Sequence, residues 1–175
     1  GRDNDGYYFW GLGTKPTDCP VCTPDTPDSD DSNVAVGPMD SYGNPLPYVF
    51  PYDTVYINSN TVFATDTVIC GNMVVQNNAT LTLSANLTMN PAAKIFVKNS
   101  GHLMVDGGTI TNSKIKVFDY GKLTLKNNAT LKQHSHGDLN IATHGLFNME
   151  YGNIDDALDE VPADGLLFEA TDLQV

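Results

Sequence analysis

The chain has 175 residues, a length that suits one domain. Nine Lys and Arg stand against 21 Asp and Glu, which gives a formal net charge of −12. This balance argues against a nucleic-acid partner, because such binding depends on neutralising phosphates with basic side chains. Asn and Thr contribute seventeen residues each and favour turns and strands, which argues against an α-helical protein. No apolar run approaches the roughly 18 residues of a membrane span.

Residues 1–53 are predicted to be an acidic, Pro- and Asp-rich N-terminal tail that ends in a capping strand. Residues 23–32 contain Pro and acid but no apolar side chain, which is typical of a solvated linker. The aromatic cluster at residues 7–10 is expected to pack on its own chain, with a partner surface as the alternative. Prolines around Tyr48-Val49-Phe50 favour an edge or capping strand there.

The three cysteines are Cys19, Cys22 and Cys70. The Cys-Pro-Val-Cys run lacks the second ligand pair of a zinc site, and no βαβ pattern surrounds it as in redox proteins. We therefore predict either a local disulfide between Cys19 and Cys22 or two free thiols, with no metal or cofactor.

Residues 54–154 contain an internal repeat, in which a small residue is followed two positions later by a large apolar one. The small residues are spaced mostly seven or eight apart: Gly71, Ala79, Ala85, Ala93, Gly101, Gly108, Ser113, Gly121, Ala129, Gly137, Gly145 and Gly152. The third positions are all apolar: Met73, Leu81, Leu87, Ile95, Leu103, Ile110, Ile115, Leu123, Leu131, Leu139, Phe147 and Ile154.

Each repeat reads as a short strand with one buried face, because apolar residues two apart alternate with polar ones. Asn in front of the small residue, as at Asn77-Asn78 and Asn127-Asn128, tolerates the left-handed backbone of a tight corner. The corners leave too few residues for crossover helices, so parallel strands require a solenoid.

Taken in threes, the repeats form coils of 20 to 24 residues. The predicted fold class is all-β: a single-stranded parallel β-helix, right-handed, with three short strands per coil and four to five coils. A two-faced coil is the alternative. Hexapeptide solenoids keep a strict spacing of six, which this chain does not.

Three runs carry a family resemblance: residues 77–83, 101–110 and 121–125. They resemble the rungs of secreted and cell-surface parallel β-helix proteins of bacteria, especially of the Bacteroides group, with a pectate-lyase-like solenoid. The resemblance implies a secreted or cell-envelope location. The proteins of this group range from adhesins to polysaccharide-degrading enzymes. The resemblance therefore implies the architecture more than the activity.

Residues 155–175 depart from the repeat and are predicted to be a C-terminal cap. Residues 155–161 read as a short helix with acid in its first turn, ended by Pro162. Residues 166–168 read as a strand.

An enzyme that cleaves polysaccharides would need a basic residue or paired carboxylates. The only Arg is Arg2, and the acids of residues 54–149 fall at separate places in the repeat: Asp66, Asp106, Asp119 and Asp138. His134, His136 and His144 suggest a metal, but no further ligand is clearly placed, so we predict a solvated loop there, with His102 pointing outward from its rung.

Outward positions align into rows when the coils are stacked. One row, Asn86, Thr109, Thr130 and Asn153, is the candidate ligand-binding ladder; another holds Asn72, Lys94, Lys114 and Asp138. Hydrogen bonding between rungs is the alternative role of such rows. The sequence thus favours a non-catalytic structural or adhesive module for carbohydrate or a host or cell-surface partner. The alternative is a polysaccharide lyase or glycoside hydrolase, or a fragment of one.

The acidity is confined to the two ends of the chain. Residues 54–149 hold four acids and seven lysines, whereas residues 1–53 hold nine acids and two bases, and residues 150–175 hold eight acids and no base. Any attraction of an acidic ligand must therefore come from the lysines of the repeat.

Overall fold

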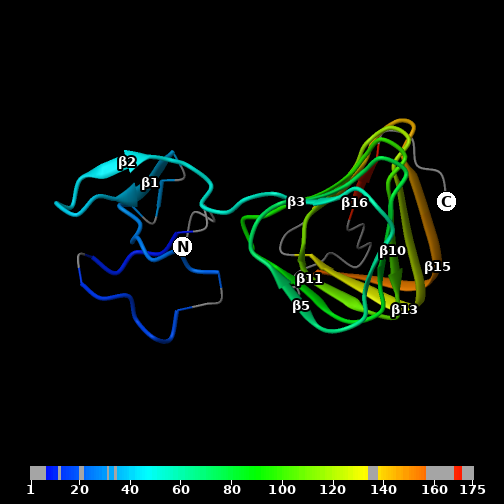
Figure 1. Cartoon of the computed structure of the whole chain (residues 1–175), viewed down its shortest axis with the longest axis horizontal. Coiled ribbons are helices and arrows are strands. Elements are labelled where there is room, and N and C mark those ends of the chain that lie inside the picture. Colours follow the sequence, from blue (N-terminus) through cyan, green and yellow to red (C-terminus); the bar gives the residue numbers. More distant parts are fainter. Residues whose placement is uncertain are drawn as a thin grey trace. The chain divides into compact units, whose positions relative to one another are not determined.

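The computed structural model describes residues 7–11, 13–19, 22–30, 32–33, 35–133, 138–156 and 168–170. The chain forms two compact units: Gly1–Tyr52 with Asn90–Ala92, and Asp53–Met89 with Ala93–Val175. The described residues contain strands, bridges and turns but no helix (Figure 1). In this part of the chain no helix is therefore long and apolar enough to cross a membrane.

The first unit contains one antiparallel strand pair, β1 (Val36–Met39) and β2 (Pro45–Pro47). Its aromatic cluster packs on its own chain as expected: Tyr7 is buried, its hydroxyl donates to the Val49 carbonyl at 2.9 Å, and its ring meets that of Tyr48 edge-on.

Two predictions for this unit differ from the structure. Residues 23–30 are not a free linker. The backbone N–H of Asp28 donates to the Tyr8 carbonyl at 2.8 Å, and Asp28 forms an isolated antiparallel β-bridge with Pro38. The expected strand at Tyr48-Val49-Phe50 does not form; the strand is β2, directly before it. Long-range backbone hydrogen bonds outweigh local composition here.

The cysteines also differ from the predicted arrangement. Cys19 is a free cysteine, whereas Cys22 and Cys70 are both disulfide-bonded. The predicted Cys19–Cys22 disulfide is therefore wrong: closeness in sequence did not determine which cysteines are oxidised.

The second unit is a parallel β-helix of about 5 turns. Figure 1 shows its strands stacked around a common core. Its strands are β3 (Val55–Ile57), β4 (Thr61–Phe63), β5 (Thr67–Ile69), β6 (Met73–Val75), β7 (Thr80–Leu83), β8 (Leu87–Met89), β9 (Ile95–Val97), β10 (His102–Asp106), β11 (Thr109–Ser113), β12 (Ile115–Val117), β13 (Lys122–Gln133), β14 (Leu139–Ile141), β15 (Leu146–Asp156) and β16 (Phe168–Ala170).

The strands of successive turns pair in parallel to form two sheets. The six-stranded sheet has the order β16-β14-β12-β9-β6-β3. The eight-stranded sheet covers the other two faces in the order β4-β7-β10-β13-β11-β8-β5, with β15 paired to β13. It is one sheet because β13 and β15 continue through the corner that separates β7 from β8 and β10 from β11. The predicted three strands per coil are therefore found, two of them merged in the last turns.

The core of this unit consists of the predicted apolar positions. Eleven of the twelve third positions of the repeat are buried, and Ile154 is half-buried. The strand register explains why these positions are buried in every turn. Leu103 pairs with Leu81 in the turn before and with Leu123 in the turn after, so like side chains stack inside the coil. Burying each such Leu contributes about 1.5–3 kcal/mol.

The corners use left-handed backbone, as predicted from their Asn residues. Asn77 and Asn78 have φ of 58° and 60°, and Asn127 and Asn128 have φ of 55° and 61°. Small residues follow because the rungs stack closely there: a Cβ on Gly101 would overlap the Val75 carbonyl.

The C-terminal segment joins the stack at its described residues. β15 includes Asp155 and Asp156, so the helix predicted from residue 155 does not begin there; the rest of that helix lies outside the described residues. The predicted strand at residues 166–168 is represented by β16, which pairs in parallel with β14. Parallel pairing extends the sheet by one strand.

Candidate functional site

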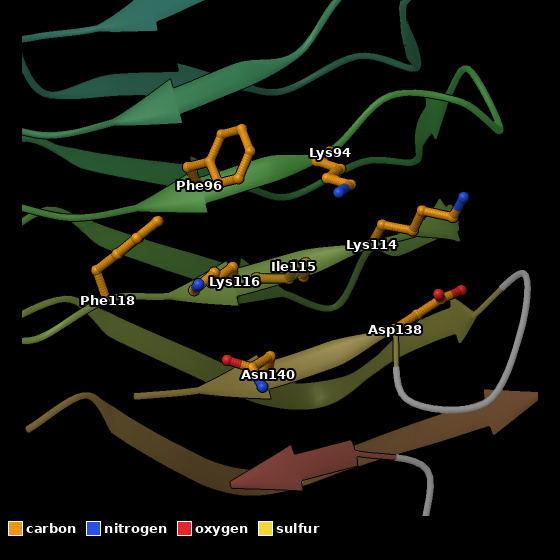
Figure 2. A pocket seen from close by; sticks show the side chains of 8 residues that line it. All are labelled: Lys94, Phe96, Lys114, Ile115, Lys116, Phe118, Asp138 and Asn140. Carbon is orange, nitrogen blue, oxygen red and sulfur yellow. The ribbon is translucent and has the colours of Figure 1, made fainter. Parts of the chain in front are cut away.

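The outer face of the six-stranded sheet is hollowed by a groove with a volume of about 390 Å³. We call it the basic-aromatic groove. Figure 2 shows its lining: Lys94, Phe96, Lys114, Ile115, Lys116, Phe118, Asp138 and Asn140.

Strand alternation places these side chains outside. In β9, Ile95 and Val97 are fully buried in the core, so Phe96 between them must face outward. The same holds for Lys116 in β12 and Asn140 in β14. Because Phe96, Lys116 and Asn140 are paired across the three strands, they form one row.

A second row precedes the first by two residues. Lys94, Lys114 and Asp138 each lie directly before a paired residue, and the backbone N–H groups of Ile95 and Ile115 donate to the carbonyls of Lys114 and Asp138, both at 2.8 Å. The row predicted from sequence as Asn72, Lys94, Lys114 and Asp138 is thus aligned in the structure. Oδ1 of Asn72 accepts the backbone N–H of Lys94 at 2.8 Å.

Two phenylalanines make the aromatic end of the groove. The ring centroids of Phe96 and Phe118 are 5.9 Å apart, with their planes tilted by 50°. The ammonium of Lys116 lies 4.7 Å from the centroid of Phe118, within the range of a cation–π interaction. The rings of Phe96 and Phe118 and the ammonium of Lys116 therefore form one surface that combines apolar area with positive charge.

The lysine end of the groove is partly dehydrated. Burial lowers the pKa of Lys114, the charge of Asp138 opposes this by favouring the ammonium, and the charge of Lys94 lowers the pKa further. Three ammonium groups and one carboxylate line the groove, so its balance is positive although the chain's net charge is −12.

The candidate ladder of Asn86, Thr109, Thr130 and Asn153 is aligned as predicted, because Thr109 pairs with Thr130 and Thr130 with Asn153. Asn86 precedes Leu87, the partner of Ile110. Part of the ladder lines a second, more polar groove of about 360 Å³: Asp66, Thr67, Val68, Asn86, Thr88, Thr109, Thr111 and Lys132.

Hydrogen bonds across rungs occupy part of this ladder. Oδ1 of Asp66 accepts the backbone N–H of Asn86 at 3.0 Å, and Oδ1 of Asn86 accepts that of Thr109 at 3.2 Å. These bonds support the structural role that the sequence left as an alternative. A ligand-binding role for Asn86, Thr109, Thr130 and Asn153 stays a prediction.

The histidines do not gather with other ligands in the described residues. His144 stacks on Tyr120, with its Nδ1 3.7 Å from Asp119, and His102 shares a 2.8 Å hydrogen bond with Thr124. His134 and His136 lie outside the described residues. Across the described ranges, no three His, Cys, Asp or Glu side chains form a potential metal site.

The other acids of the repeat have structural contacts. Asp106 pairs with Lys126 at 3.5 Å and accepts a hydrogen bond from the Asn127 amide, and Asp119 accepts the backbone N–H of His144 at 2.9 Å. Asp138 is the acid of the repeat that lines the basic-aromatic groove.

Comparison of the chain with protein-family models, curated proteins and solved structures found no match. The class of protein that the fold defines is the parallel β-helix, and the basic-aromatic groove is its candidate functional site.

Sequence reasoning did not single out Phe96, Lys116, Phe118 and Asn140. A signal was present: Phe96 stands at an outward position between two core residues, where this repeat usually has a polar side chain. An aromatic residue at an outward position, paired with a lysine of the neighbouring strand, indicates a binding surface.

Proposed function

We propose that this protein is a non-catalytic adhesive module that binds carbohydrate in the basic-aromatic groove. The observation that carries the proposal is the pair Phe96 and Phe118, 5.9 Å apart on one face beside Lys94, Lys114 and Asn140.

The chemistry of the groove suits a sugar. The C–H faces of a pyranose ring are apolar and stack on aromatic rings, while its hydroxyls need hydrogen-bond partners around them. Ligand sites generally combine apolar and aromatic lining with a few placed polar groups. Here the lysine ammoniums and the Asn140 amide provide donors, and the Asp138 carboxylate accepts. The groove is open, so it fits an internal stretch of a chain as well as its end.

We further propose a location outside the cytoplasm, secreted or on a cell envelope, in a protein like the surface β-helices of Bacteroides-type bacteria. Disulfides persist mainly in oxidising compartments, and Cys22 and Cys70 are both disulfide-bonded. A carbohydrate or a host-surface molecule is the partner that this location would supply.

A polysaccharide lyase is the second candidate, and one residue favours it. Lys114 has a pKa lowered by burial, which favours a neutral amine able to accept a proton. In a β-elimination this amine would take the proton next to the uronate carboxylate while the glycosidic C–O bond breaks. The unsaturated product absorbs ultraviolet light, so incubation with polygalacturonate, with and without calcium, tests this candidate directly.

The adhesive function is tested on a glycan array and by calorimetry with the full chain. We expect Phe96→Ala with Phe118→Ala to weaken saccharide binding at least tenfold, which corresponds to about 1.4 kcal/mol. The matched control is Thr109→Ala with Thr130→Ala, in the other groove, which is expected to leave binding unchanged.

Two results would contradict this proposal. Loss of binding in the threonine variant but not in the phenylalanine variant would move the site to the predicted ladder. An array without any bound saccharide would remove the function. Circular dichroism of both variants checks that their β-structure is intact.

A further inference from the structure

The basic-aromatic groove has two chemically different ends. Figure 2 shows Phe96 and Phe118 at one end and Lys94, Lys114 and Asp138 at the other, with Lys116 between them. The Lys116 ammonium lies against the Phe118 ring, so it belongs to the aromatic end. The groove therefore presents two aromatic rings with one ammonium against them, followed by a pair of lysines, an arrangement that suits a ligand with an apolar part and a charged part.

Lys94 and Lys114 are held close together by the fold. They occupy the same position directly before β9 and β12, and parallel neighbours in a sheet lie about 4.8 Å apart. Their like charges repel each other. Burial lowers the pKa of Lys114 most, and the charge of Lys94 lowers it further. The charge of Asp138, one rung further, favours the ammonium form of Lys114. An anion placed over both ammoniums would relieve this repulsion.

Charge distribution along the chain adds a second argument. Residues 54–149 have seven lysines and four aspartates, and three of those lysines line this one groove. In a chain with a net charge of −12, positive charge is scarce, and its concentration at one partly buried place favours a negatively charged ligand.

Resting on the function proposed above, we propose that the bound saccharide is anionic, with a sulfate ester or carboxylate between Lys94 and Lys114 and its sugar ring on Phe96 and Phe118. Ammonium groups bind such oxyanions as point charges and form charge-assisted hydrogen bonds with them. The carboxylate of Asp138 borders this place and repels the ligand's charge, which limits affinity.

The experiment measures binding of three polymers to the full chain: dextran, dextran sulfate and polygalacturonate. We expect both anionic polymers, or one of them, to bind at least tenfold more tightly than neutral dextran. Which polymer binds distinguishes a sulfate ester from a carboxylate. Equal affinity for dextran would overturn the anion site while leaving the carbohydrate function in place, whereas no binding to any polymer would contradict both.

Variants locate the anion. Lys94→Gln with Lys114→Gln is expected to reduce binding of the anionic polymer at least tenfold. The matched control, Lys122→Gln with Lys132→Gln, makes the same change of charge on β13 in the other sheet and is expected to have less than a twofold effect. Equal losses in both double variants would reduce the interaction to general charge and overturn the site.

A gain of affinity gives an independent check that misfolding cannot imitate. Asp138→Asn removes the repelling carboxylate and is expected to tighten binding of the anionic polymer about threefold, because like charges oppose binding. Weaker binding by this variant would contradict the placement of the anion beside Asp138.

Discussion

Single outward side chains of the β-helix bind the rung next to their own. Oδ1 of Asn60 accepts the backbone N–H of Thr80 at 2.9 Å, one turn later, just as Asp66, Asn72 and Asn86 do at their positions. A net hydrogen bond of this kind contributes about 0.5–1.5 kcal/mol. Surface Asn and Asp residues therefore contribute to stacking, although their side chains lie outside the core.

The charge of His102 affects the stability of the fold below neutral pH. Burial lowers its pKa below the usual value of 6.5, and the charges of Lys122 and Lys126 lower it further. The folded protein therefore holds the neutral imidazole more strongly than the unfolded chain does. Stability rises with pH between the lowered pKa and 6.5, and it is lost as the pH falls through this window.

We predict that His102→Gln reduces the loss of stability on acidification. Gln keeps a polar partner for Thr124 but takes up no proton. The measurement is the fall in Tm between pH 7.5 and pH 5, which should be smaller in the variant than in the wild type. All other titrating groups are shared by the two proteins. An equal or larger fall in the variant would contradict the assignment to His102.

The element that determines the stacking of the rungs is the corner. Small residues were predicted there from the repeat. The structure gives the reason at Gly101: its backbone N–H donates to the Lys98 carbonyl at 2.8 Å, and a Cβ added to it would overlap the Val75 carbonyl. A larger residue must move one rung away from the next. Corners therefore restrict the sequence to small residues, as the core restricts it to apolar ones.

We predict that Gly101→Ala destabilises the protein by about 1–3 kcal/mol, the usual cost of forcing extra atoms into a packed site. The control is Gly13→Ala, where a Cβ would meet nothing within 4 Å. Urea denaturation followed by circular dichroism measures both. Equal stability of the Gly101 variant and the wild type would show that the rungs adapt at this corner.

Sequence alone predicted the elements whose physics is local and repeated. Leu81, Leu103 and Leu123 were assigned to the core because alternation and coil length agree, and the structure stacks them there. The merging of two faces in β13 was not predicted, because it depends on whether backbone pairing continues through the corner. Phe96 was not singled out, because the sequence analysis looked for rows of polar and charged side chains at the outward positions.

The whole molecule joins an irregular unit to a repetitive one, and this explains where prediction failed. In the first unit, the backbone N–H of Asp28 donates to the Tyr8 carbonyl and the hydroxyl of Tyr7 donates to the Val49 carbonyl. No repeat in the sequence predicts these hydrogen bonds. Both the linker at residues 23–32 and the Cys19–Cys22 disulfide were predicted from nearby sequence only. Such features depend on distant partners.

The cysteines give the test at this scale. We predict that the unfolded, unreduced chain has one reactive thiol, Cys19, and that three thiols react after reduction, because Cys22 and Cys70 are disulfide-bonded. Alkylation followed by peptide mass spectrometry identifies the labelled positions. Labelling of all three before reduction would contradict the oxidised state of Cys22 and Cys70.

Parallel stacking keeps every strand close in sequence to the strand that it pairs with. His102 pairs with Thr80 and with Lys122, 22 and 20 residues away, and Lys122 pairs with Leu146, 24 residues away. These separations are about one eighth of the 175 residues, a contact order typical of mixed α/β domains rather than β-sandwiches. We therefore expect this all-β unit to fold faster than a sandwich of its size, each turn serving as the template for the next.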